Sequence, residues 1–227
     1  NETSNETSKS STISSTPTVP LTPYTLPIPP PPLPSNPIQI TLPLSPPATI
    51  LMTPSLSRPI PSHLDLSPAS STSPSFEGGH TTWESSYDVA SALPSLSHLF
   101  TPGCRALDLG CGTAVATVAL HVLKGRGVIP PSVRLQVLDY NETVIREQTL
   151  PNLRLNGVDL DAASWGDWKG LGEAHGDDMV VVTCETVYTR AKCEELCELF
   201  RRVRPRAVVM AGKRFYFGLD GGVQVFR

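Results

Sequence analysis

Two acidic residues and a pair of glycines are the side chains whose types and spacing first suggest chemistry. Asp108 lies at the end of an apolar run and is followed by Gly110 and Gly112, and Asp139 ends a second apolar run. Glycine accepts backbone angles that other residues avoid, and it lets a ligand approach the main chain closely. An acidic residue at the tip of the second strand is where α/β nucleotide-binding folds hold a ribose diol. The pattern therefore predicts a cradle for a nucleotide-type cofactor.

A further acidic residue follows the apolar run 178–183. The sequence there is Glu185-Thr186-Val187-Tyr188, and the tips of buried strands are where active sites gather in such folds. Glu185 and Tyr188 are therefore the candidate catalytic residues. The alternatives are structural, because Glu185 could be the capping partner of the next helix and Asp108 could cap the helix that follows the glycine turn.

Two pairs of residues could complete a binding site at the same edge. Trp83 and Glu84 follow a glycine-rich stretch and begin a helical pattern, so they could cover a ligand. Core packing for the Trp and helix capping for the Glu are their ordinary roles. Asp167 and Trp168 follow a short strand pattern, where Asp167 could instead be a turn residue.

Strand and helix patterns alternate along residues 83–217. Strands are expected at 105–109, 133–138, 164–168, 178–183 and 207–210, the last extending as far as Phe217. Helices are expected at 83–96, 113–123, 144–155 and 190–203, with Thr81 or Thr82 capping the first and Pro151 breaking or kinking the third. This order predicts an α/β fold with a Rossmann-like, doubly wound and mainly parallel sheet.

The composition changes near residue 75. Of 24 prolines, 18 lie between positions 17 and 74, in a segment dominated by Ser, Thr and Pro with very few charges. Such a segment buries too little apolar surface to offset the entropy lost on ordering. We therefore expect a disordered arm at residues 1–75 and one globular domain at residues 76–227. The more apolar stretch 38–52 could instead lie on the domain as an edge strand or strap.

Charge and cysteine usage narrow the class of function. The net charge of −3 provides no basic field for nucleic acid. No apolar run approaches the ~20 residues that span a bilayer. Five cysteines without regular pairing favour a reducing compartment, and Cys193 and Cys197 lack the second pair of ligands that a zinc site needs. The five histidines have no ligand spacing and are expected at the surface. We therefore expect no metal, no membrane and no direct nucleic-acid contact.

Seven short motifs follow one another along the second part of the chain. They are Phe-Glu-Gly-Gly-x-x-Thr-Trp-Glu (76–84), Asp-Leu-Gly-Cys-Gly-Thr-Ala (108–114), Asp-Tyr-Asn (139–141), Thr-Leu-Pro-Asn (149–152), Gly-Asp-Trp (166–168), Glu-Thr-Val-Tyr (185–188) and Tyr-Phe-Gly-x-x-Gly-Gly (216–222). The glycine turn after an acidic strand is typical of seven-stranded S-adenosylmethionine-dependent methyltransferases. Together the motifs resemble the protein-histidine N-methyltransferase family that modifies a histidine of the large-subunit ribosomal protein uL3.

The resemblance implies a cofactor, an acceptor and roles for the candidate residues. The cofactor is S-adenosyl-L-methionine, the partner is the protein substrate uL3, and the expected location is the cytoplasm and nucleus, with the complete domain a monomer. Asp108 is expected near the methionine amine, and Glu185 with Tyr188 is expected to face the acceptor histidine. The residues assigned to the cofactor are Trp83, Glu84, Asp108, Gly110, Gly112, Asp139, Tyr140, Asn141, Asp167 and Trp168.

The chain departs from the patterns of related families at several positions. Val115 stands where a dinucleotide fingerprint has its third glycine, which disfavours a nicotinamide oxidoreductase. Ser85 and Cys184 replace a Cys and a Ser of the methyltransferase family. The helix and strand pair that follow the last glycine turn in the family are not found before Arg227, so the last strands are expected to be missing. Protein-lysine methylation and an inactive methyltransferase-like binding module are the alternative functions.

Overall fold

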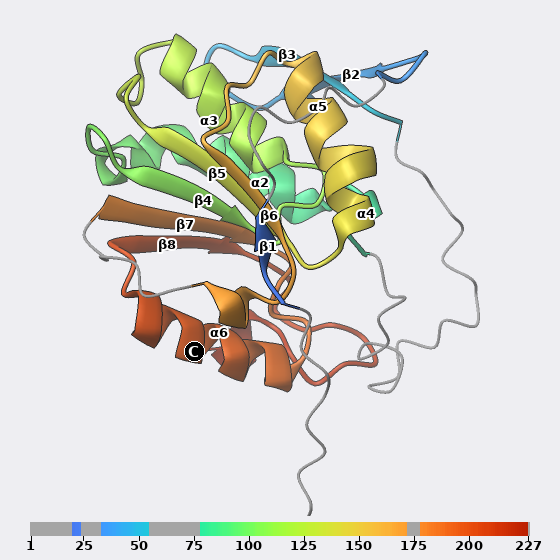
Figure 1. The fold of residues 1–227 in the computed structure, drawn as a ribbon, viewed down its shortest axis with the longest axis vertical. Helices are drawn as coiled ribbons and strands as arrows, with labels where there is room; N and C mark the ends of the chain where they lie inside the picture. The colour runs from blue at the N-terminus through green and yellow to red at the C-terminus, as the bar shows by residue number, and fades with distance from the viewer. Residues whose placement is uncertain (1–19, 24–32, 55–77, 172–177, 227) are drawn as a thin grey trace, which may run out of the picture.

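A six-stranded sheet forms the centre of the molecule (Figure 1). The computed structural model describes residues 20–23, 33–54, 78–171 and 178–226. The sheet order is β1-β6-β5-β4-β7-β8, with β1 antiparallel to β6 and the other neighbours parallel. The strands are β1 (Thr22–Pro23), β4 (Arg105–Leu109), β5 (Arg134–Asp139), β6 (Ala162–Trp165), β7 (Met179–Cys184) and β8 (Ala207–Ala211). The predicted doubly wound α/β sheet is confirmed, and β8 is its edge within the described residues.

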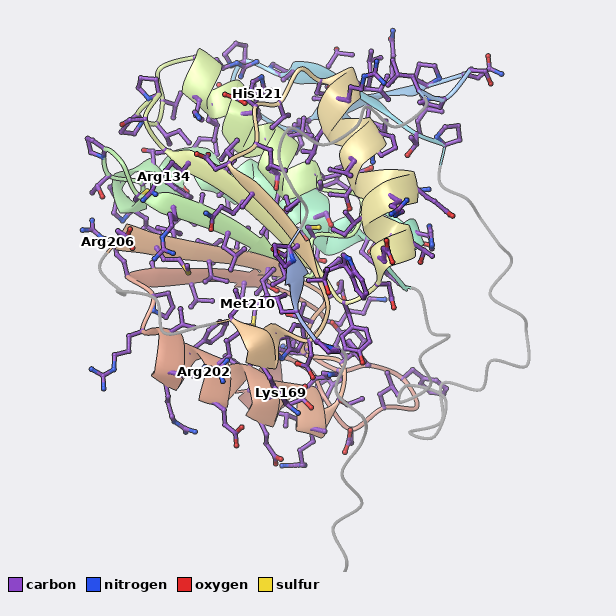
Figure 2. All side chains as sticks on the ribbon, viewed as in Figure 1. His121, Arg134, Lys169, Arg202, Arg206 and Met210 are labelled. Carbon is purple, nitrogen blue, oxygen red and sulfur yellow. The ribbon has the colours of Figure 1, made fainter. Side chains whose placement is uncertain are left out.

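The central strands are apolar along their length because both of their faces are covered. β7 has the sequence Met-Val-Val-Val-Thr-Cys, and its first five residues are buried. Helices α2 (Glu84–Ala92), α3 (Val115–Gly125), α4 (Glu142–Val144) and α5 (Leu150–Leu155) lie on one face, and α6 (Arg190–Val203) and α7 (Val223–Phe226) lie on the other. Each face has its own apolar cluster. In Figure 2, Met210 lies between the sheet and α6, while Arg134 and Arg206 mark the end of the sheet where the strands begin.

Two helices differ from their predicted form at a proline. The first helix ends at Ala92 and continues as a 3-10 segment, η2 (Leu93–Leu99), because Pro94 has no N–H to donate. Pro151 neither breaks nor ends its helix. It lies in the first turn of α5, where a missing N–H costs little, directly after the π-helical turn η3 (Ile145–Thr149).

Two further local predictions are wrong. The N-cap of α2 is Trp83, without a side-chain capping bond, and the Thr82 hydroxyl instead pairs with that of Thr113 at 2.9 Å. β8 ends at Ala211 and does not extend to Phe217, because residues 212–222 form a loop that returns to the segment after β7, where Gly222 N donates to the Val187 carbonyl. None of the described helices is both long enough and apolar enough to cross a membrane.

A hairpin from the Pro-rich arm packs on the domain. β2 (Ile38–Leu42) and β3 (Ala48–Met52) pair antiparallel in a separate two-stranded sheet, with Ile40 opposite Ile50. Their inward residues join the apolar cluster beneath α3 and α5. The prediction of disorder is therefore wrong for residues 33–54, and the strap alternative for residues 38–52 is confirmed. Residues 20–23 are also ordered against the sheet, while the expected domain boundary at 75–76 lies outside the described residues.

The hairpin should contribute measurably to stability. Ile50 is 2% exposed and Ile38 is 43% exposed, so the two isoleucines form a matched pair. We expect Ile50→Ala to lower the free energy of unfolding by about 2–5 kcal/mol, because it removes buried methyl groups and leaves a cavity. Ile38→Ala should change it by less than about 1 kcal/mol. Urea unfolding measures both, and equal effects would show that the hairpin does not pack on the domain in solution.

Candidate functional site

The residues proposed from the sequence gather at one edge of the sheet. Asp108 and Leu109 end β4, Asp139 ends β5, and Glu185 directly follows β7. Because β4 pairs in parallel with both β5 and β7, the three strands finish side by side. The carboxyl ends of such strands are the usual ligand edge of an open α/β sheet.

The glycine turn between β4 and α3 adopts the backbone that its sequence predicts. Gly110 has φ +67° and Gly112 has φ +50°, both in the left-handed region. A Cβ on Gly110 would lie 2.7 Å from Thr186 Cγ2, and one on Gly112 would lie 3.3 Å from the carbonyl oxygen of Gly79. The glycine-rich stretch before α2 thus closes directly over the turn, and side chains are excluded from both positions.

Asp139 is held against this turn. Its Oδ2 accepts a hydrogen bond from Gly112 N at 3.0 Å, and its Oδ1 accepts one from Asn141 N at 3.1 Å. The residue is only 6% exposed, although it ends its strand. Burial raises the pKa of Asp139, while the N–H groups and the charge of His80 oppose that rise. His80 itself is buried, which corrects the prediction that the histidines lie at the surface.

Asp108 takes the structural role that the sequence left open. Its Oδ2 accepts hydrogen bonds from the hydroxyl of Thr117 at 2.7 Å and from Thr117 N at 3.2 Å, within the first turn of α3. Burial raises the pKa of Asp108 to about 7. Asp108 therefore caps α3, whose N-cap Ala114 has no side-chain capping bond. Contact with a methionine amine stays a prediction.

The Thr-Leu-Pro-Asn motif (149–152) binds the backbone carbonyls of the glycine turn. Sequence reasoning missed this role. The hydroxyl of Thr149 donates to the Gly112 carbonyl at 2.6 Å, and Asn152 Nδ2 donates to the Thr113 carbonyl at 2.9 Å. Asn152 Oδ1 accepts from Thr53 N at 2.6 Å, so the hairpin connects to the turn through this one side chain. The motif itself was visible in the sequence, but the residues that Thr149 and Asn152 bind lie far from them along the chain.

The pair Asp167 and Trp168 lies at the end of β6. Asp167 Oδ1 accepts a hydrogen bond from Lys169 N at 2.9 Å. Asp167 is therefore a turn residue, which was the structural alternative to a role in binding. Trp168 is buried between the sheet and α6, and its Nε1 has no hydrogen-bond partner within the described residues. Lys192 of α6 lies 5.0 Å above the Trp168 ring and 5.8 Å from that of Tyr140. Contact of these rings with an adenine stays a prediction.

Trp83 and Glu84 follow the glycine-rich stretch that covers Gly112. Trp83 Nε1 donates to the Gly78 carbonyl at 3.0 Å, which fixes the stretch that covers Gly112. Lys213, from the loop after β8, lies 5.5 Å from the Trp83 ring. Glu84 is exposed in the first turn of α2. The structure thus gives Trp83 a part in the shape of the site, whereas the role of Glu84 stays a prediction.

Glu185 is not the cap of α6. That position belongs to Thr189, whose hydroxyl accepts from Lys192 N at 3.2 Å. The Glu185 carboxylate instead accepts a hydrogen bond from the hydroxyl of Tyr216, a residue that sequence reasoning did not place in the site. Tyr188 is half-buried three residues further along the chain, and burial raises its pKa to about 12. The charged groups that add to this rise are Glu195, Asp139 and Tyr140, so a pairing of Tyr188 with Glu185 stays a prediction. The arrangement presents a carboxylate and phenol groups beside the glycine cradle.

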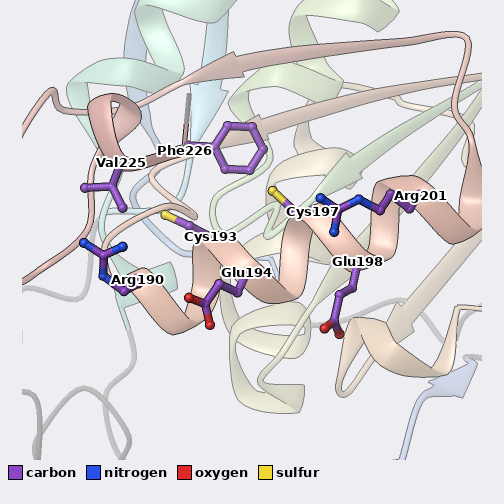
Figure 3. A pocket seen from close by; sticks show the side chains of 8 residues that line it. All are labelled: Arg190, Cys193, Glu194, Cys197, Glu198, Arg201, Val225 and Phe226. Carbon is purple, nitrogen blue, oxygen red and sulfur yellow. The ribbon is translucent and has the colours of Figure 1, made fainter.

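A groove of about 360 Å³ lies elsewhere, between α6 and α7 (Figure 3). Cys193 and Cys197 both line it, together with charged side chains of α6 and the end of α7. None of the proposed site residues lines this groove. Within the described residues no group of three His, Cys, Asp or Glu side chains is placed to hold a metal ion.

Comparison with known proteins finds relatives of one kind. No protein-family model matches the chain. It is 29% identical over 157 residues to a histidine protein methyltransferase 1 homolog of Dictyostelium discoideum, covering 66% of this chain and 48% of that protein. A homolog of the same name from Mus musculus is 28% identical over 206 residues, covering 76% of this chain and 53% of the mouse protein. The chain thus resembles curated histidine protein methyltransferases and spans about half the length of the relatives it matches.

Solved structures align only weakly. A cyclopropane-fatty-acyl-phospholipid synthase-like protein from Lactobacillus casei shares 15% identity with a TM-score of 0.35, covering 58% of this chain and 53% of that one. A TM-score of this size does not identify a shared fold. The fold assignment therefore rests on the order and direction of the strands.

Proposed function

We propose that this chain carries an S-adenosylmethionine-dependent protein methyltransferase domain whose acceptor is a histidine side chain. The observation that carries the proposal is the similarity to several curated relatives, which are all named histidine protein methyltransferase 1. It is supported by the glycine turn at the tip of β4 and the carboxylate at the tip of β5.

The residues at the sheet edge fit such a cofactor. Gly110 and Gly112 leave a turn without side chains, and a Cβ at either position would meet a neighbour. Asp139 accepts backbone hydrogen bonds from Gly112 N at Oδ2 and from Asn141 N at Oδ1, and a carboxylate offers about four acceptor sites in all. A ribose diol is a suitable donor, since a hydrogen bond to a charged group contributes about 1.5–3 kcal/mol.

The bound cofactor supplies a methyl group on a sulfonium, which is already electrophilic. The protein has to hold a neutral imidazole nitrogen in line with that methyl group. Imidazole has a pKa near 6.5, so it is largely neutral at cellular pH and needs little activation. Positioning by Glu185 and its neighbours is therefore the main catalytic contribution, and effective molarity can provide about 7–11 kcal/mol for well-oriented groups.

The protein substrate is proposed to be ribosomal protein uL3, encountered in the cytoplasm or nucleus. Calorimetric titration with S-adenosylmethionine and, separately, NADH tests the cofactor, and binding of NADH alone would indicate an oxidoreductase instead.

Methyl transfer to histidine-containing uL3 peptides, with matched peptides in which the histidine is replaced by alanine, tests the acceptor. Mass spectrometry should place the methyl group on histidine. A methyl-lysine product would identify a lysine methyltransferase, and cofactor binding without transfer would favour a binding module.

Glu185 should matter for transfer and not for cofactor binding. We expect Glu185→Gln to keep the Kd for S-adenosylmethionine within a few-fold while it lowers kcat by about tenfold or more, since the uncharged amide is a weaker acceptor for the imidazole N–H. Calorimetry and steady-state kinetics separate the two effects. Loss of cofactor binding with normal turnover at saturation would place Glu185 in the cofactor site.

A further inference from the structure

The loop formed by residues 212–222 runs from the end of β8 back to the tip of β7. Glu185 N donates to the Ala211 carbonyl at 3.0 Å, which continues the β7–β8 ladder by one bond. At the far end of the loop, Gly222 N donates to the Val187 carbonyl at 2.6 Å. The loop is therefore tied by backbone bonds to the segment that carries the candidate catalytic residues.

Tyr216 lies in the middle of this loop and meets Glu185. Its hydroxyl donates to Glu185 Oε2 and accepts a longer bond from Lys213 N at 3.4 Å. A Cβ on Gly212 would lie 3.2 Å from the hydroxyl oxygen and 3.3 Å from Val187, so the glycine leaves room for the phenol. Burial and the carboxylate raise the pKa of Tyr216 well above its ordinary value. The hydroxyl thus stays a donor throughout the physiological range.

The backbone of Glu185 is unusual at the same point. Its φ is +56°, in the left-handed region that a residue with a side chain rarely adopts. The described residues include three such non-glycine positions, namely Ala114 in the glycine turn, Glu185, and Arg204 at the end of α6. Two of the three therefore lie at the proposed site. Left-handed residues of this kind persist where the surroundings hold them, and they cluster at functional sites.

We propose that Tyr216 is a positioning residue for methyl transfer, because its hydroxyl fixes the Glu185 carboxylate through Oε2. The other oxygen, Oε1, which receives no hydrogen bond from the described residues, is left to accept the acceptor's imidazole N–H. This inference rests on the proposed function.

A hydrogen bond from the imidazole N–H to Oε1 fixes the tautomer in which the other ring nitrogen carries the lone pair. That nitrogen attacks the methyl group. The N–C bond forms as the C–S bond breaks, and the N–H proton then leaves through the Glu185 carboxylate to water. Tyr216 gives up no proton in this step.

The packing of Tyr216 separates this role from a structural one. Its ring lies against the apolar cluster between the sheet and α6, so Tyr216→Phe keeps the ring and removes only the hydroxyl. Tyr87 offers a matched control, because it is half-buried on α2 and packs against the other apolar cluster. Tyr87→Phe removes a hydroxyl of the same type away from Glu185.

Kinetics of the two variants test the proposal. We expect Tyr216→Phe to bind S-adenosylmethionine within about twofold of wild type, with kcat on the histidine peptide lowered about tenfold or more. Tyr87→Phe should match wild type in both respects. An unchanged kcat in Tyr216→Phe would overturn the positioning role.

A spectroscopic titration makes the pair testable without turnover. Ionisation of the tyrosines is followed by ultraviolet absorbance in wild type, in Glu185→Gln and in Tyr216→Phe. We expect one tyrosine to ionise at lower pH in Glu185→Gln, and that transition to be absent from Tyr216→Phe. Identical titrations of wild type and Glu185→Gln would overturn the pair. A wild-type chain that shows the pair but transfers no methyl group would contradict the proposed function instead.

Discussion

Replacing Asp139 with alanine should weaken S-adenosylmethionine binding by at least tenfold, which corresponds to about 1.4 kcal/mol. Two effects act in the same direction. The variant removes the acceptor proposed for the ribose diol, and it also removes the group that receives Gly112 N at 3.0 Å. The glycine turn therefore loses both a ligand contact and an internal support. Calorimetric titration of the two proteins at the same pH measures the change in Kd.

A second variant separates the two effects. Asp139→Asn keeps one acceptor oxygen for the Gly112 N–H but lacks the negative charge, so we expect it to lie between wild type and Asp139→Ala. Because Asp139 is 6% exposed, thermal unfolding of each variant has to accompany the titration. Full affinity in a folded Asp139→Ala protein would remove this residue from the cofactor site.

The positions of the acidic residues were predictable because each of them ends a buried apolar run. A parallel sheet brings the carboxyl ends of neighbouring strands to one edge, so Asp108, Asp139 and Glu185 had to lie near each other once the strands were recognised. Their individual partners were not predictable in the same way. Asp108 turns to Thr117, nine residues away, whereas Glu185 meets Tyr216, and that contact depends on a loop closing behind β8.

Composition alone predicts disorder for the whole N-terminal arm, and this prediction fails at residues 38–52 for a physical reason. A Pro-rich, weakly charged segment has too little apolar surface to fold alone, and that argument holds for an isolated chain. Residues 38–52 are not isolated in this structure, because Leu42, Ile50 and Met52 are buried in the apolar cluster of the domain. Binding of the arm to an existing apolar surface cannot be deduced from average composition. The higher apolar content of residues 38–52 was the signal that indicated it.

Replacing Asn152 with alanine should lower the free energy of unfolding by roughly 3–5 kcal/mol, because it leaves several buried polar groups without partners. Asn152 has no exposed surface and makes hydrogen bonds to Thr53 on one side and to the Thr113 carbonyl on the other. Chemical unfolding measures the loss. Since Thr113 belongs to the glycine turn, the same variant should also weaken S-adenosylmethionine binding by about five- to tenfold in the protein that stays folded.

Asn156 provides the control that tells these two consequences apart. It holds the same hairpin, through Leu51 N at 3.0 Å and the Leu51 carbonyl at 2.6 Å. Its Nδ2 also donates to the backbone carbonyl of Asn152 at 2.8 Å, but the structure describes no contact between its side chain and the glycine turn. Asn156→Ala should therefore lower stability while leaving the Kd for S-adenosylmethionine within about twofold of wild type, because this variant keeps the Asn152 side chain and its bond to the Thr113 carbonyl. If both variants weakened cofactor binding equally, the effect would come from loss of the hairpin as a whole. If neither did, the bond from Asn152 to Thr113 would support the fold alone, and the glycine turn would keep its shape without it.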